Sequence, residues 1–108
     1  MKKMSSIILS IWFISSMSLM VFATVTSAGG GTWDYGVRHS EGGTCWSNYL
    51  HNNLRHGSTA INGVGDKDYD DGIDAGKESY ASVGSTSHGN RAYWHRCGID
   101  KKCGYTQD

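Results

Sequence analysis

The chain has 108 residues, a formal net charge of +0, 15 glycines and no proline. This length fits one domain at most, and the balanced charge gives no reason to expect a polyanionic partner. Composition therefore excludes a multidomain enzyme, a collagen, a coiled coil and a strongly basic nucleic-acid binder, but not a small secreted β-domain.

Residues 1–28 are typical of a signal peptide. They begin with two lysines after the initial methionine, continue as an uncharged and mainly apolar stretch, and end on the small residues Thr26 and Ala28. A retained membrane anchor is the alternative, because the stretch approaches the roughly 20 apolar residues that a span needs. We expect cleavage after Ala28 and secretion. This leaves 80 residues with a net charge of −2 and no further apolar run long enough for a membrane span.

The rest of the chain consists of short runs rich in β-branched and aromatic residues, separated by glycine, asparagine and aspartate, which predicts strands. The predicted strands cover residues 32–37, 45–52, 58–64, 77–83 and 92–95. A helix over residues 74–82 is the alternative for the fourth strand, although Gly76 weakens it. The polar and acidic residues 63–76 are predicted to form a loop.

Short strands at this spacing predict an all-β fold, a small antiparallel β-sandwich or a small barrel, and we favour the sandwich. The sandwich domain is placed at residues 29–96, and a polar, cysteine-containing tail follows at residues 97–108. A domain of this size buries roughly 60% of its unfolded surface, so it gains from a covalent cross-link.

Three cysteines, Cys45, Cys97 and Cys103, follow the predicted signal peptide. Secretion favours a disulfide, any two of the three could pair, and one thiol is left over. A bond from Cys45 to either of the other two would close a loop of about 50 residues and restrict the unfolded chain most. We therefore expect that bond rather than the short Cys97–Cys103 loop. The remaining thiol would be free or would link two chains.

Two parts of the chain contain side chains that could bind a metal ion. His95, Cys97 and Cys103 offer zinc ligands, but their spacing matches no standard zinc pattern, and secreted thiols usually oxidise. Residues 66–78 contain aspartates at alternate positions, as a calcium loop of the EF-hand type requires, but the expected glycine and glutamate each come one residue late. We expect a solvated acidic turn there, with a non-standard calcium site as the alternative, and we predict no cofactor.

Histidines are numerous, and none has the spacing of a zinc-protease motif, so we expect them at the surface. They are His39, His51, His56, His88 and His95. The chain has no nucleophile elbow and no phosphate-binding glycine loop, and a pair of Cys45 with a histidine has no further support. We predict that the protein is not an enzyme.

Tyrosine and tryptophan dominate the aromatic residues, and phenylalanine is missing after residue 28. Their rings have apolar bodies and polar tips, which suit a small core as well as contact with a carbohydrate or a headgroup. We expect about half of them in the core. The aromatic candidates for ligand binding are Trp33, Tyr35, Trp46, Tyr49, Tyr93 and Trp94.

Five short motifs occur in an order that resembles the lactococcin 972 family of bacteriocins. They are Gly31-Thr32-Trp33 with Tyr35-Gly36-Val37, Trp46-Ser47-Asn48-Tyr49, His56-Gly57-Ser58-Thr59-Ala60, Ala75-Gly76-Lys77 with Tyr80-Ala81-Ser82-Val83-Gly84, and Ala92-Tyr93-Trp94. The resemblance spans residue 29 to about residue 96. The three cysteines and the tail after Trp94 depart from the family pattern.

The resemblance implies a secreted β-sandwich that acts on related Gram-positive bacteria. It further implies binding of the cell-wall precursor lipid II and a block of septum formation, without pores. Lipid II presents a disaccharide, a pyrophosphate and a peptide. Aromatic faces would stack on the sugars, and Arg38, Arg55 or Arg91 would take the pyrophosphate.

The sequence also leads to expectations about partners and to an alternative function. A homodimer is allowed, and an immunity transporter is expected in the producing cell. The alternative function is a secreted β-sandwich binding module without killing activity, at the cell surface or a host interface.

Overall fold

The computed structural model describes residues 21–103. Most of the predicted signal peptide and residues 104–108 of the predicted tail lie outside this range. The described chain is all-β, as predicted, with seven strands and no helix. The strands are β1 (Val21–Ala28), β2 (Gly31–Arg38), β3 (Thr44–Leu50), β4 (His56–Ile61), β5 (Lys67–Ile73), β6 (Glu78–Gly84) and β7 (Arg91–Arg96).

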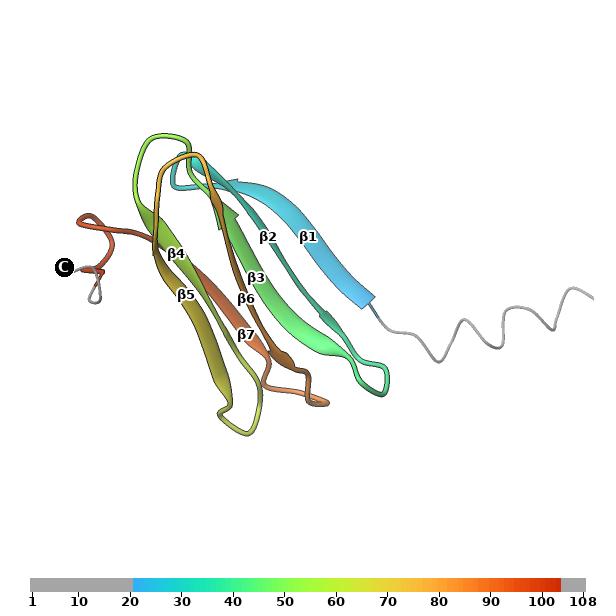
Figure 1. The fold of residues 1–108 in the computed structure, drawn as a ribbon. Coiled ribbons are helices and arrows are strands. Elements are labelled where there is room, and N and C mark those ends of the chain that lie inside the picture. Colours follow the sequence, from blue (N-terminus) through green and yellow to red (C-terminus); the bar gives the residue numbers. More distant parts are fainter. Residues whose placement is uncertain (1–20, 104–108) are drawn as a thin grey trace, which may run out of the picture.

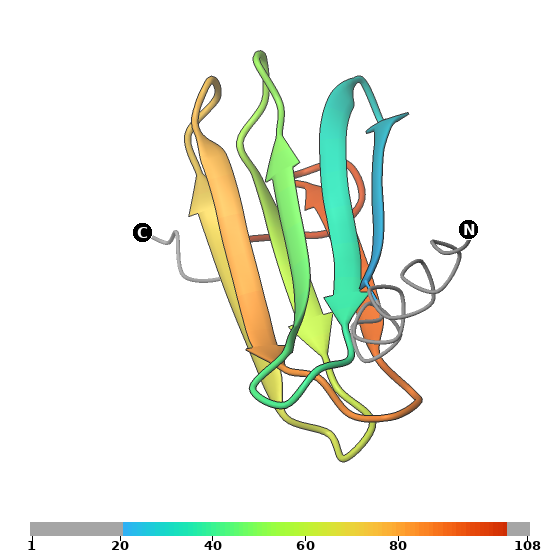
Figure 2. The same cartoon turned by 90° about the vertical axis from the view of Figure 1, so that its right-hand side faces the viewer.

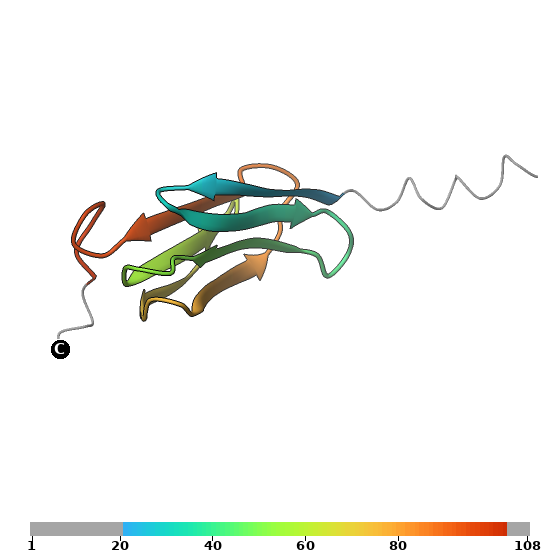
Figure 3. The same ribbon diagram turned by 90° about the horizontal axis from the view of Figure 1, so that it is seen from above.

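The strands form two antiparallel sheets that stack as a sandwich (Figures 1 and 3). The four-stranded sheet has the order β1-β2-β3-β6, and the three-stranded sheet has the order β5-β4-β7. Strand β6 packs on β4 and β5, β3 packs on β4 and β7, and β2 reaches β7. Strand β1 contacts only β2 among the described strands, so it extends past the smaller sheet at one side (Figure 2).

All five strands predicted after residue 28 are present, as β2, β3, β4, β6 and β7. The predicted loop at residues 63–76 is wrong, because Lys67–Ile73 forms strand β5. Its aspartates have a role that composition does not reveal. The carboxylates of Asp68 and Asp70 accept hydrogen bonds from the backbone N–H groups of Ser82 and Tyr80, at 2.9 and 2.8 Å. These carboxylates occupy backbone N–H groups at the free edge of β6, so they block further strand pairing there.

Strand β1 consists of the last eight residues of the predicted signal peptide. It pairs with β2 along its whole length, from Val21 opposite Arg38 to Ala28 opposite Gly31, and it is exposed. Cleavage after Ala28 remains a prediction, and it would remove β1 and make β2 an edge strand. Within residues 21–103 no helix has the length and apolar character that crossing a bilayer demands.

Apart from the completely buried rings of Tyr49 and His56, the interior is built from small side chains. An apolar part contains Cys45, Ala60 and Ala81, with Val37 and Val83 packed beside it. The other part is polar, because Ser47, Ser58 and Ser79 are completely buried. Buried hydroxyls need partners, and these have them. Ser79 donates to the Ser58 hydroxyl at 2.8 Å, and Ser47 donates to the Tyr93 carbonyl at 2.8 Å.

Candidate functional site

Tyr49, one of the six aromatic candidates, is completely buried. Its hydroxyl donates to the Ala28 carbonyl at 2.7 Å, and its ring centroid lies 5.1 Å from that of Trp94. Burial is the main cause that raises the pKa of the Tyr49 phenol. Trp94 is held on its other side by the β1–β2 turn, where a side-chain carbon at Gly29 would collide with its ring. Both residues therefore stabilise the fold.

Trp33 and Tyr35 form a stacked pair on the inward face of β2, with ring centroids 3.8 Å apart. The indole N–H of Trp33 donates to the buried Ser47 hydroxyl at 2.9 Å. Trp46 lies on the opposite, outer face of the four-stranded sheet, where its indole N–H donates to Asp34 Oδ1 at 3.0 Å. Each of the two indoles is thus already satisfied within the protein.

The three predicted arginines do not converge. Arg91 begins β7, whereas the Arg55 carbonyl accepts a hydrogen bond from Cys97, just past the other end of that strand. Arg55 is further engaged with the Gly72 carbonyl at 2.7 Å and with the Asp74 carboxylate at 3.7 Å. Arg38 ends β2 in the other sheet. The fold therefore does not bring the three arginines together into a single pyrophosphate site.

The outer face of the three-stranded sheet carries a row of exposed rings. Strand register places Thr59 directly between Tyr69 and Tyr93. Tyr69 is 63% exposed and Tyr93 is 47% exposed, and neither hydroxyl has a hydrogen-bond partner among residues 21–103. Adjacent strands lie about 4.8 Å apart, so the two tyrosine backbones stand about 10 Å from each other. We call Tyr69, Thr59 and Tyr93 the tyrosine row.

An open depression of about 580 Å³ lies over the tyrosine row. Its charged lining residues are Lys67, Asp100 and Lys101. The next row of the sheet places Ile61 between Lys67 and Arg91, so Arg91 is a third cation, beside the depression. Of the predicted candidates, Tyr93 and Trp94 line this depression, and Arg91 lies beside it. The sequence pattern does not point to Tyr69 or the two lysines, because the composition of residues 63–76 predicts a loop and that of residues 97–108 predicts a tail outside the domain.

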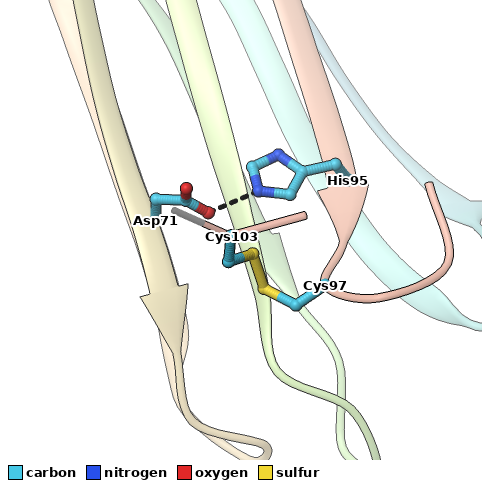
Figure 4. Close-up of side chains that lie close together, drawn as sticks. All are labelled: Asp71, His95, Cys97 and Cys103. Carbon is cyan, nitrogen blue, oxygen red and sulfur yellow. Dashed lines mark hydrogen bonds and ion pairs between the residues drawn. A yellow bond between two sulfur atoms is a disulfide. The ribbon is translucent and has the colours of Figure 1, made fainter. Parts of the chain in front are cut away.

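Beyond the other end of the tyrosine row lies a cluster of ligand-type side chains, Asp71, His95, Cys97 and Cys103 (Figure 4). His95 Nε2 lies 2.5 Å from Asp71 Oδ1, and both side chains are at most 10% exposed. The His95 ring reaches β5 by lying across Gly57 of the middle strand. A side-chain carbon there would come within 2.7 Å of His95 Nε2.

The predicted pairing of Cys45 with the tail is wrong. The disulfide joins Cys97 to Cys103, with their Cα atoms 5.3 Å apart, and Cys45 is a free, buried thiol. Cys45 points between the sheets and lies 3.5 Å from the Arg91 carbonyl, and burial raises the pKa of its thiol. Cys45 lies beside the start of β7, whereas the tail follows the other end of that strand, so the larger loop entropy of the alternative pairing is irrelevant.

The expectation of surface histidines is wrong for His51, His56 and His95, which are at most 5% exposed. Nδ1 of His51 accepts two backbone N–H groups, those of Asn53 and Leu54, at 3.1 Å. His56 has a carbonyl oxygen within 2.8 Å of each ring nitrogen. The aspartates of the proposed calcium loop are engaged as well, since Asp66 accepts from the Asn62 side chain at 3.1 Å and the other two hold β6.

Comparison with known proteins bears on the whole domain. The family model described as Bacteriocin (Lactococcin_972) matches residues 29–94, more than half of the chain. Searches of curated proteins and of solved structures each gave no match. The matched span begins after the predicted cleavage point and ends within β7, so it includes the tyrosine row and stops before His95. The chain therefore belongs to the lactococcin 972 family of bacteriocins.

Proposed function

We propose that this protein is a secreted antibacterial protein that binds lipid II and blocks cell-wall synthesis at the septum of related Gram-positive bacteria. It would act by binding rather than by catalysis. Family membership supports the antibacterial role. The observation that carries the binding proposal is the tyrosine row, whose rings are exposed and whose hydroxyls have no partner in the described chain.

The tyrosine row suits a sugar ligand for physical reasons. Aromatic faces stack against the C–H groups of sugar rings, and free phenol hydroxyls can bond sugar hydroxyls. Thr59 between Tyr69 and Tyr93 is small, so the space of about 10 Å between the two strands stays open. A disaccharide would therefore lie along the row with one ring on each tyrosine.

Cations beside the row suit the pyrophosphate. Lys67 and Lys101 line the depression, and Arg91 extends from the neighbouring row. The remaining charge in the lining, Asp100, is occupied by Arg96, whose guanidinium donates to both of its carboxylate oxygens at 2.8 and 3.0 Å. The positive charge is local, because the chain without residues 1–28 has a net charge of −2. This favours a specific anionic ligand over general attraction to an anionic bilayer.

The experiment is a growth-inhibition assay with the secreted protein on related Gram-positive bacteria, paired with binding to vesicles that contain lipid II. We compare the wild type with Tyr69→Ala, Tyr93→Ala and the control Tyr80→Ala. Tyr80 is 62% exposed on the outer face of the other sheet. Each change in the row should weaken binding and inhibition about tenfold, the equivalent of one lost stacking contact. The control should change neither, and added lipid II should abolish inhibition.

Other outcomes would redirect the proposal. Inhibition that added lipid II leaves intact would keep the antibacterial role and reject this target. Absence of inhibition from folded, oxidised protein would favour the non-killing binding module instead. A homodimer and an immunity transporter in the producing cell belong to the proposal as partners. The homodimer rests on the odd number of cysteines, and the transporter rests on the family resemblance.

A further inference from the structure

We propose that the C-terminal loop is closed in two ways, by the Cys97–Cys103 disulfide under oxidising conditions and by a zinc ion when these two cysteines are reduced. The ligands would be both cysteine sulfurs, Nε2 of His95 and a carboxylate oxygen of Asp71. This site adjoins the proposed lipid II surface, because His95 also lines the depression over the tyrosine row, and it goes beyond the antibacterial function.

The four ligand atoms already surround a common point. All of them lie within 4.8 Å of one another, and Figure 4 shows the four side chains converging from β5, β7 and the loop that follows β7. Tetrahedral zinc with bonds of about 2.0 Å to nitrogen or oxygen and 2.3 Å to sulfur separates its ligands by about 3.3–3.8 Å. The two sulfurs are bonded to each other in the disulfide, so reduction has to come first and let them move apart to about 3.8 Å.

The fold holds the two non-cysteine ligands in place. Asp71 stands at a bulge of β5, where pairing with β4 shifts between His56 and Ser58 and Gly72 adopts a φ of 68°. This bulge offers an additional residue opposite β4, a device that proteins use to redirect a side chain. Asp71 is thereby aimed at His95 across Gly57, so two neighbouring residues of the sheet are fixed before any ion arrives.

Burial and ligand type favour zinc over other ions. Residues His95 and Cys103 are 5% and 6% exposed, and the Asp71 side chain is 10% exposed, so water competes poorly for the ion. Two thiolates, one imidazole and one carboxylate form a soft and compact set with four ligands, which suits zinc and not calcium or magnesium. His95, Cys97 and Cys103 lie beyond the matched residues 29–94, so the family match covers only Asp71 of this cluster.

The exchange between the two closures balances. A phosphine reductant takes up the oxygen of one water molecule and gives two electrons to the S–S bond, and the two protons of that water convert the sulfurs to thiols. Zinc then displaces both thiol protons into solvent. Nε2 of His95 first releases to solvent the proton that it donates to Asp71, and Nδ1 carries the proton of the neutral ring. Nε2 then binds zinc through its lone pair, and the hydrogen bond with Asp71 is replaced by the two metal bonds.

The test uses the secreted chain with Cys45→Ala, so that Cys97 and Cys103 supply all thiols. The protein is reduced with a phosphine without oxygen and titrated with Co²⁺ as a spectroscopic probe. We expect one Co²⁺ per reduced chain, with thiolate charge-transfer absorption and tetrahedral d–d bands, and its displacement by Zn²⁺. The same protein in its oxidised form should give neither absorption.

A second pair of variants tests the ligand set. Asp71→Asn should weaken metal binding by about tenfold or more, whereas Asp74→Asn should have no effect, because that side chain is 72% exposed and outside the cluster. Zinc should raise the melting temperature of the reduced chain and leave that of the oxidised chain unchanged. Reduced protein with native circular dichroism that takes up no Co²⁺, or equal binding by both aspartate variants, would overturn the proposal.

Discussion

The two outer faces of the sandwich each carry a ring that lies across a glycine of a neighbouring strand. On the four-stranded sheet, Trp46 covers Gly36, and a side-chain carbon at that glycine would lie 2.7 Å from the indole. On the three-stranded sheet, His95 covers Gly57, with the corresponding contact at 2.6 Å. The same device gives different results, because the two rings meet different partners.

Trp46 ends on Asp34, a single hydrogen bond that completes the surface of its sheet. His95 ends on Asp71, beneath a tail whose disulfide closes over the pair. Beside this buried pair the tyrosine row remains exposed, with unpartnered hydroxyls in the described chain. An aromatic ring on an outer face of the sandwich does not by itself indicate a binding surface. Rings with unsatisfied polar tips, next to free cations, are the better indication.

The largest expected effect comes from adding a side chain at Gly57, and the same change at Gly36 is its matched comparison. Gly57→Ala should lower the free energy of unfolding by about 3 kcal/mol, because its Cβ meets the His95 ring and lies 2.8 Å from the Asp70 carbonyl, a backbone group. Gly36→Ala should cost about 1 kcal/mol in protein without residues 1–28. In that protein the contact of a Gly36 side chain with strand β1 is absent. The clash that remains is with the outer edge of the Trp46 ring, which can rotate into solvent. Urea unfolding of the secreted variants measures both, and a larger loss for Gly36→Ala would break the comparison.

A smaller effect is expected for Trp46→Phe. The substitution removes the indole N–H that donates to Asp34, which should lower the free energy of unfolding by about 1 kcal/mol. Growth inhibition should stay at the wild-type level, because this face is complete in itself. Thermal melting and the inhibition assay check the two expectations. Loss of inhibition by a folded Trp46→Phe protein would instead make the four-stranded sheet part of the target-binding surface.

The smallest expected effect concerns acid. Hydrogen bonds from Arg96 hold the pKa of Asp100 below its ordinary value. A lowered pKa in the folded state means that this contribution is present above the unfolded value of about 4 and disappears as the pH falls through the folded value. The wild type should therefore melt above Asp100→Asn at about pH 6, and the two melting curves should converge towards about pH 2. A difference that does not depend on pH would show that the ion pair does not stabilise the tail.

Much of the fold follows from local pattern. Alternation along the strand predicts that Trp33 and Tyr35 share one face and that Thr59 and Ile61 share one face of theirs, and both pairs lie so in the structure. Strand β5 was missed because Asp68 and Asp70 are poor strand formers. They lie in a strand because their carboxylates accept hydrogen bonds from free backbone N–H groups of β6. One of these donors, Ser82, is more than ten residues away from Asp68 along the chain.

The sites were less predictable for related reasons. Cys45 is in phase with the buried Ser47 and Tyr49 along β3, and this alternation indicates an inward thiol that cannot reach the tail. Loop entropy alone does not contain that information. Tyr69 could not be assigned to a surface without strand β5. The convergence of Asp71 with His95 depends on a missing side chain at Gly57, which no spacing rule records.

The hairpin turn at Gly29 and Gly30 sets an order of events during maturation. Both glycines have positive φ, of 58° and 87°, and the Ala28 carbonyl is held by the Tyr49 hydroxyl. A peptidase binds its substrate in an extended form, and this turn cannot extend without separating β1 from β2. Cleavage after Ala28, as the sequence predicts, therefore has to precede folding. If this cleavage takes place, processing and folding compete in time, and a precursor that folded first would keep β1 and protect its own cleavage point.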